Sequence, residues 1–441
     1  MSGYRTLHRH EIRSHPQSKE EEKEGNLEPT WSVCFSPCNQ THLQSRMVTT
    51  SSDSTAPLRL LTSSADGIIR AYAIIDKSSI SNKDVLDASA LSMKLDQVLL
   101  SKANMTYPPS SEVSNLGLSL GCAALTVIRN YVGDDDRAGG ELSAAVRLDG
   151  HISVWLRDEQ PLYASNDSTD DSNLNSDVDV VRPNFEFCIK NSTGTSILLI
   201  PPQLTGYSTH GVIMMVGCLD GSVAFVCTGV GIPDIRKGND TSKASESGMV
   251  LDNVGSGNSI PMSLALHPTA FLTFAVGRKN GTIDIYNSSP DGISSTSRDN
   301  VYGRFRRCHH LNHHAPSPIR ALRYTPDGSL LISGCDEGHI YIHDMSSFQE
   351  NRTVRMVAAI LNAHKGYILS IDVLPDSSRF ITSSADRTVK VWDVGAPNSG
   401  PVHTFETGHD KMIWDVTCSL DGRRCVSCSD DGRLQVYSCE V

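Results

Sequence analysis

The sequence lacks the features that mark several common classes of protein. Acidic residues outnumber basic ones by 50 to 39, so the formal net charge is −11 and there is no basic stripe to follow a phosphate backbone. We therefore expect no direct binding of nucleic acid. Neither an apolar leader nor an apolar run of 18 residues occurs, which argues against a membrane-spanning helix and favours a soluble intracellular protein.

Patterns typical of catalysis and of metal binding are also missing. The 12 cysteines do not have the spacing of a disulfide framework. No glycine-rich phosphate loop, Ser-His-Asp order or nucleophile elbow is present. The run from Cys308 to His314 has residue types that suit zinc but no second cysteine pair, so we interpret His314 as a loop histidine of a repeat. The sequence thus predicts no enzyme, no cofactor and no metal site.

What the sequence does contain is a repeated pattern, clearest between His364 and Asp393. Three short segments, 368–373, 380–384 and 389–392, alternate apolar and polar residues and are separated by turn-forming residues. This pattern predicts a meander of three strands. Opened by a histidine and closed by Trp-Asp within a unit of about 40 to 45 residues, the meander resembles a WD repeat, one blade of a β-propeller.

Copies of this pattern recur along the chain. A shift of 45 residues places His364 on His409, and the six-residue spacing from turn to aromatic residue defines the other copies. The seven pairs are Asp66/Tyr72, Asp149/Trp155, Asp220/Val226, Asn280/Tyr286, Glu337/His343, Asp386/Trp392 and Asp431/Tyr437. Seven meanders predict an all-β fold, and the resemblance to WD repeats implies that they close into one seven-bladed β-propeller spanning residues 1–441.

The copies also predict where the blades begin and end. We expect blades at approximately 28–100, 118–190, 194–232, 258–307, 314–361, 364–406 and 409–441. The stretches 158–182 and 233–257 are polar, and we interpret them as insertions that decorate the ring. Because the seventh copy ends after its third strand, we expect the strand-capable segment 4–12 to supply the missing outer strand and close the ring.

A set of four side chains in blade six can form a linked polar network. The carboxylate of Asp386 would accept a hydrogen bond from His364, whose ring would bond the hydroxyl of Ser384, and this hydroxyl would receive the indole N–H of Trp392. Thr382 is an alternative source of the hydroxyl. We interpret this tetrad as structural, because its members satisfy one another inside the blade.

Two other copies depart from this set. Blade seven has Tyr437 in the place of the tryptophan, and blade four has Asn280 in the place of the aspartate. We expect the polar network to be weaker or absent in both blades.

Functional positions should be ones that the repeat itself does not need. When the first strands are aligned on the residues at their ends, one position falls near the mouth of the expected central channel. It holds Trp31, Thr195, Met262, Arg320, Leu369 and Trp414. Because Trp and Arg are enriched in binding hot spots, we predict a partner-binding surface there, with packing between blades as the alternative. A partner segment with an apolar side chain beside a polar or acidic group would fit, with Arg320 as its cationic contact.

Three runs in the C-terminal third carry a closer resemblance. They are PIRALRYTPDGSLLISGCDEGHIYIHD, SSADRTVKVWDVG and DDGRLQVYSCEV. With these runs the chain resembles the WD-repeat subunit family of the superkiller (Ski) complex, which is also found with the Paf transcription elongation complex. The resemblance is strong from about Pro316 to Val441 and weak in blades two and three, where insertions depart from the family pattern.

The resemblance implies a non-catalytic scaffold. Its partners would be a tetratricopeptide-repeat subunit and an RNA helicase, for messenger RNA decay by the exosome in the cytoplasm, with a second role beside the Paf complex in the nucleus. It also implies Trp31, Arg320, Leu369 and Trp414 as the partner surface. An alternative from another class is the substrate-recruiting propeller of a ubiquitin ligase, which would need an adaptor-binding segment that the N-terminal residues do not show.

Overall fold

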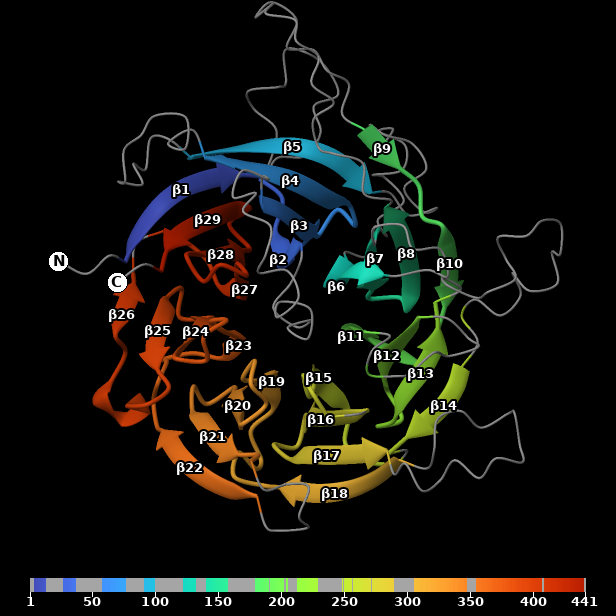
Figure 1. Cartoon of the computed structure of the whole chain (residues 1–441), viewed down its shortest axis with the longest axis vertical. Coiled ribbons are helices and arrows are strands. Elements are labelled where there is room, and N and C mark those ends of the chain that lie inside the picture. The colour runs from blue at the N-terminus through green and yellow to red at the C-terminus, as the bar shows by residue number, and fades with distance from the viewer. Residues whose placement is uncertain are drawn as a thin grey trace, which may run out of the picture.

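In the computed structural model, seven β-sheets are arranged in a ring around a central channel (Figure 1). The structure describes residues 4–12, 27–36, 58–76, 91–99, 122–131, 140–157, 179–189, 191–201, 204, 212–228, 248, 250–255, 257–270, 272–288, 305–346, 354–406 and 408–439. The ring of seven sheets confirms the predicted seven-bladed β-propeller. Within these residues no helix is long and apolar enough to cross a bilayer.

Each blade is a twisted antiparallel meander whose first strand lines the channel and whose fourth strand lies outermost. Blade one holds β2 (Thr30–Ser36), β3 (Leu58–Ser64), β4 (Ile69–Asp76) and β5 (Leu91–Leu99). Blade two holds β6 (Cys122–Tyr131), β7 (Gly140–Arg147), β8 (His151–Arg157) and β10 (Phe185–Cys188). Blade three holds β11 (Ser192–Ile200), β12 (Ile213–Cys218), β13 (Val223–Cys227) and β14 (Val250–Val254).

The remaining blades repeat the same order. Blade four holds β15 (Pro261–Leu266), β16 (Thr273–Arg278), β17 (Ile283–Ser288) and β18 (Phe305–Leu311). Blade five holds β19 (Ile319–Tyr324), β20 (Leu330–Cys335), β21 (Ile340–Asp344) and β22 (Arg355–Ile360). Blade six holds β23 (Ile368–Val373), β24 (Arg379–Ser384), β25 (Val389–Asp393), the 3₁₀ helix η10 (Pro397–Ser399) and β26 (His403–Phe405). Blade seven holds β27 (Ile413–Cys418), β28 (Arg424–Ser429) and β29 (Arg433–Ser438), completed by β1 (Arg5–Glu11).

Two stretches expected to be insertions contribute strands. The outer strand of blade three, β14, lies inside the stretch 233–257, and β9 (Asp179–Val181) lies inside 158–182. β9 adds in parallel to the edge of β5 in blade one. Likewise β18 ends at Leu311, beyond the expected end of blade four at 307. Pairing with a neighbouring strand edge, which local patterning does not specify, decides that these segments form strands.

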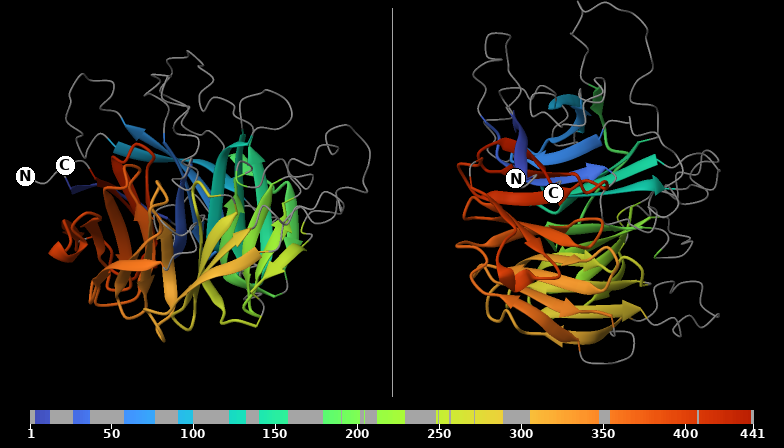
Figure 2. Two further views of the ribbon diagram at one scale, coloured as in Figure 1. Left: turned by 60° about the horizontal axis from the view of Figure 1, so that its bottom comes forward. Right: turned by 60° about the vertical axis from the view of Figure 1, so that its left-hand side comes forward.

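The N-terminal segment closes the ring, as predicted. β1 pairs antiparallel with β29, from Arg5 opposite Ser438 to Glu11 opposite Arg433. In both views of Figure 2 the blue strand β1 stays beside the red strands of blade seven. Leu7 of β1 and Ile12, directly after it, are buried, so the edge of β29 is covered.

The hydrophobic core lies between adjacent blades. Strands such as β12 and β16 are buried along their whole length because both of their faces meet a neighbouring blade. At the seam between blades seven and one, a single cluster joins Leu7 of β1, Phe35 of β2 and Val436 of β29. Closure of the ring therefore buries apolar surface from both ends of the chain.

Candidate functional site

The residues predicted at the channel mouth share one local conformation. The register between the first and second strands shifts at Trp31, Met262, Arg320, Leu369 and Trp414, each of which is the extra residue of a β-bulge. A bulge breaks the alternation of side chains and can re-aim the extra one. All five side chains are half-buried. The side chain of Thr195, the sixth residue of this set, lies outside the described residues.

These five residues from five blades line one hollow at the mouth of the channel. It has a volume of about 360 Å³ and also includes Leu148, at the end of the second strand of blade two. A narrower space of about 160 Å³ continues from it into the channel past Arg320, Leu369 and Asp415. The structure thus brings together all five residues of the predicted surface.

Two tryptophans in this hollow share one carboxylate. The indole nitrogen of Trp414 donates to Oδ1 of Asp430 at 2.7 Å, and the indole nitrogen of Trp31 donates to the same oxygen at 3.2 Å. Asp430 lies in the turn between β28 and β29, and Trp31 lies in blade one. Trp414 also packs against the hydrophobic cluster at the seam between blades seven and one, so the exposed remainder of each half-buried ring is what a partner can contact.

The arginine in the hollow is already paired. Arg320 donates from Nε and Nη2 to the two oxygens of Asp336, at 2.6 and 3.1 Å. Its guanidinium carbon also lies 5.7 Å from the ring centre of Tyr367. Asp336 thus offsets the charge that we expected Arg320 to offer to an acidic partner group, and that contact stays a prediction. Among the described residues, Asp336 and Asp430 bind mouth residues and Asp415 lines the same hollow, so three carboxylates accompany this guanidinium.

A further carboxylate ties the strands beneath the tryptophans. Oδ2 of Asp415 in β27 accepts hydrogen bonds from the hydroxyl of Ser32 at 2.9 Å and from the backbone N–H of Val33 at 3.0 Å, both in β2. Desolvation in the channel raises the pKa of Asp415. Asp415 thus fixes the first strands of blades one and seven against each other.

At the opposite end of the channel, the described residues line a smaller hollow. A hollow of about 30 Å³ lies between Pro201, Pro268 and Pro326 near the other ends of the first strands. A volume of that size holds little more than one water molecule. The mouth lined by the tryptophans is the better candidate for binding.

In blade six the polar network forms around Thr382. Nδ1 of His364 lies 2.9 Å from Asp386 Oδ2, and Nε2 lies 2.7 Å from Thr382 Oγ1, which also accepts the indole N–H of Trp392 at 3.0 Å. Ser384 instead accepts the backbone N–H of Asp386 at 3.0 Å. The expected place of Ser384 in the tetrad is therefore taken by Thr382, because Ser384 stands at the start of the turn and caps it.

The pKa values of this tetrad follow from burial and hydrogen bonding. Burial lowers the pKa of His364, so its ring is neutral. Burial alone would raise the pKa of Asp386, but hydrogen bonds from His364, Thr388 and the N–H of Lys365 hold it well below its usual value. A neutral imidazole between a carboxylate and a hydroxyl satisfies all three groups inside the blade.

Other blades use different side chains at these positions. In blade seven His409, Asp431, Ser427 and Tyr437 form an unbroken chain, so the expectation of a weaker network there was wrong. In blade four the buried polar contacts are centred on Arg278, which donates to Asp284 at 2.5 Å and to Tyr286 at 3.1 Å.

The run from Cys308 to His314 takes part in blade packing. His314 is buried, and its Nε2 lies 2.8 Å from Ser333 Oγ, as expected for a loop histidine. Cys308 donates to the carbonyl of Ile285, and Nδ1 of His310 lies 2.7 Å from Asp284. In the described part of the chain, no three histidine, cysteine or acidic side chains cluster closely enough to hold a metal ion.

Sequence reasoning found the five mouth residues but missed those that hold them. Asp430 and Asp336 occupy equivalent places, directly after the second strand of their blades. The recurrence of an acidic residue at that place in two blades could have indicated that it binds a mouth residue. Asp430 was overlooked because the next residue, Asp431, is the aspartate of the repeat pattern.

Comparison with known proteins identifies three of the repeats. The family described as WD domain, G-beta repeat matches residues 305–344, 356–393 and 399–438. Each matched unit begins at or near the outer strand of one blade and ends in the third strand of the next, so every sequence repeat links two blades.

Several curated proteins are similar over part of the chain. WD repeat-containing protein 1 of Gallus gallus is 26% identical over 191 residues, which cover 43% of this chain and 28% of that protein. COMPASS component SWD1 of Saccharomyces cerevisiae is 36% identical over 116 residues, covering 26% of each chain. The non-functional target of rapamycin complex subunit LST8-2 of Arabidopsis thaliana is 31% identical over 109 residues, covering 24% of this chain and 33% of that protein. The chain thus spans a third or less of the length of these relatives.

Proposed function

Because this chain is a WD40-repeat protein folded as a seven-bladed propeller, we propose that it is a non-catalytic scaffold that binds a segment of a partner protein at the channel mouth. WD-repeat propellers generally serve as protein-interaction scaffolds, and relatives are named as components of multiprotein complexes. The observation that carries the proposal is the hollow of about 360 Å³ formed by bulged residues from five blades.

The chemistry of the hollow suggests what enters it. Trp31, Met262, Leu369 and Trp414 offer apolar surface for one or two apolar side chains. Arg320 is neutralised by Asp336, and Asp430 adds a carboxylate at the tryptophan side. The mouth therefore suits an apolar anchor flanked by an uncharged polar or a basic residue better than one flanked by an acidic residue.

The proposed assembly is a Ski-type complex, on the strength of the sequence runs in blades five to seven. In it the propeller would hold a tetratricopeptide-repeat subunit beside an RNA helicase, for exosome-mediated messenger RNA decay in the cytoplasm. A second assembly, with the Paf complex, would place the protein in the nucleus. Affinity purification with mass spectrometry tests these partners, and recovery of ubiquitin ligase subunits in their place would overturn the assignment.

The decisive experiment is calorimetric titration of the tetratricopeptide-repeat subunit against Trp414→Ala and Trp31→Ala. Each truncation removes an anchor from the hollow and should weaken binding by at least about 2 kcal/mol. Val402→Ala is the matched control, since this apolar side chain is 48% exposed at the outer strand of blade six, away from the mouth. Circular dichroism confirms folding first. Unchanged affinity in both tryptophan variants would place the partner elsewhere on the ring.

A further inference from the structure

One turn of blade seven lies between the channel mouth and the closing strand. It joins β28 to β29 and contains Asp430, Asp431 and Gly432. On one side, the Asp430 carboxylate accepts both indole N–H groups of the mouth, at 2.7 Å from Trp414 and 3.2 Å from Trp31. The two tryptophans come from opposite sides of the seam, so they form a pair when the ring is closed.

On its other side, this turn holds the end of the closing strand. The carbonyl of Gly432 accepts the backbone N–H of Ile12 at 2.7 Å, and the carbonyl of Ile12 accepts the N–H of Glu28 at 2.9 Å. Gly432 has φ +71°, and a Cβ there would lie 2.7 Å from Cβ of Leu27. The turn is thus fitted closely against both strand β1 and the entry to blade one.

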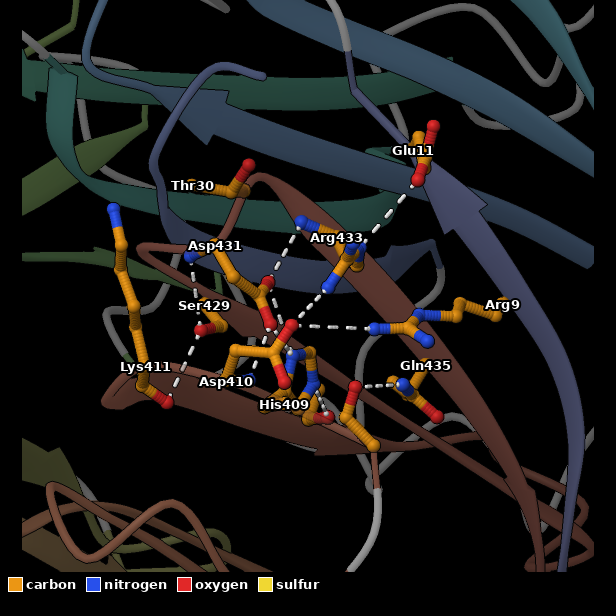
Figure 3. A network of polar contacts seen from close by, with 12 residues as sticks. Arg9, Glu11, Thr30, His409, Asp410, Lys411, Ser429, Asp431, Arg433 and Gln435 are labelled. Atoms are coloured by element: carbon orange, nitrogen blue, oxygen red, sulfur yellow. Dashed lines mark hydrogen bonds and ion pairs between the residues drawn. The ribbon is translucent and has the colours of Figure 1, made fainter.

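Charged side chains extend this contact along the closing strand (Figure 3). Arg433, directly after the turn, lies 3.5 Å from Glu11 and donates to Asp410 at 2.5 Å. Asp410 in turn lies 3.8 Å from Arg9 of β1. These pairs are partly exposed and individually weak. Together with the backbone bonds of Ile12, they place β1 against the same turn that holds the tryptophans.

We infer that Asp430 is a positioning residue that holds Trp31 and Trp414 side by side. Through Asp430, binding of a partner segment to these two tryptophans is linked to closure of the ring by β1. A partner segment that spans Trp31 and Trp414 contacts blades one and seven at once, so it favours the closed seam over any state in which β1 has detached. By reciprocity, loss of β1 weakens binding at the mouth. The partner half of this inference rests on the proposed function; the structural link between turn, tryptophans and β1 does not.

Blade five supplies a matched comparison. Asp336 stands at the same place in its blade as Asp430 does in blade seven, and it likewise binds the mouth residue Arg320. This pair lies within one blade, which blade six separates from blade seven and β1 (Figure 1). Truncating Asp336 therefore removes the partner of one mouth residue without touching the seam.

The first experiment needs no partner. Native-state hydrogen exchange of the β1 and β29 amides is compared in the full chain and in Asp430→Ala, Asp430→Asn and Asp336→Ala. Asp430→Ala should accelerate exchange at Ile12 and along β1 by at least about tenfold relative to blades three to five. Asp430→Asn, which keeps an accepting oxygen, should recover part of the protection, and Asp336→Ala should leave β1 unchanged. Equal acceleration in Asp430→Ala and Asp336→Ala, or none in either Asp430 variant, would overturn the link.

The second experiment adds the tetratricopeptide-repeat subunit. Its binding should slow exchange of β1, and deletion of residues 1–12 should weaken its binding by at least about tenfold even though no mouth residue is removed. If the subunit binds equally well to Trp414→Ala and Trp31→Ala, the proposed function fails, while the partner-free exchange still decides the structural link. Binding that depends on the tryptophans but leaves β1 exchange unaltered would overturn the coupling alone.

Discussion

The hydroxyl oxygen of Tyr437 lies 2.9 Å from Oγ of Ser427. Nε2 of His409 lies 2.8 Å from the same Oγ, and Nδ1 of this ring lies 3.0 Å from Asp431. A phenol can donate to a hydroxyl much as an indole does. The tyrosine therefore ends the polar chain of blade seven where a tryptophan ends that of blade six.

Replacing Tyr437 by Phe should lower the free energy of unfolding by about 1 to 3 kcal/mol, because Ser427 loses a partner in a buried site. Chemical denaturation measures the change. Tyr367→Phe is the control: its side chain is 51% exposed, so its removal of a hydroxyl should change stability by less than about 0.5 kcal/mol. Equal stability of Tyr437→Phe and the parent would show that the hydroxyl is not part of a stabilising chain.

Replacing Thr382 by Val should destabilise blade six by about 2 kcal/mol or more. The change keeps the shape of the side chain but leaves both the ring nitrogen of His364 and the indole of Trp392 without their partner. Ser384→Ala removes one acceptor at the turn and should cost less. Urea titration of both variants gives the order, and a larger loss in Ser384→Ala would return the hydroxyl of the tetrad to Ser384.

Deleting residues 1–12 should lower the melting temperature and promote aggregation, since the edge of β29 and the apolar residues facing Leu7 and Ile12 become exposed. Thermal melting and light scattering after size exclusion measure both effects. A double variant, Arg5→Ala with Arg9→Ala, keeps the strand while changing its exposed face and should stay monodisperse. A deletion variant that melts like the parent would contradict closure by β1.

Stability should fall as the pH drops from about 6.5 towards 4. Burial lowers the pKa of His10 to about 4 from 6.5, and the ring packs edge-on against Tyr72 with centroids 4.9 Å apart. Above pH 6.5 the His10 ring is neutral in both the folded and the unfolded chain, so protonation does not reduce the free energy of unfolding. Below pH 6.5 the unfolded chain takes up a proton that the folded chain does not, and this proton uptake lowers the free energy of unfolding. Buried His343, with a pKa of about 4, acts in the same direction.

The measurement is urea denaturation between pH 7.5 and 4.5. His10→Gln should reduce the slope of stability against pH by up to about 1.4 kcal/mol per pH unit, the value for one proton. Arg9→Gln changes the charge of the same strand without adding or removing a group that titrates in this range, and should leave the slope as it is. An unchanged slope in His10→Gln would show that this histidine is not protonated on unfolding.

Much of the fold could be predicted because it depends on local patterns. The six-residue interval from Asp386 to Trp392 and its copies fixes a tight turn and the buried residue that follows it, and both are properties of neighbouring residues. Alignment of the first strands on the residues at their ends predicted the five residues at the mouth. The need for a closing strand followed from a meander that ended one strand short.

The tertiary structure decided what depends on distant parts of the chain. Whether 250–254 forms a strand depends on the open edge of β13, and which hydroxyl reaches His364 depends on where the ring stands over β24. Trp31 and Trp414 both donate to Asp430, although Trp31 and Asp430 are 399 positions apart in the sequence. No pattern of neighbouring residues specifies such a contact. The contact forms only after all seven blades have folded, because the closed ring is what brings the two ends of the chain together.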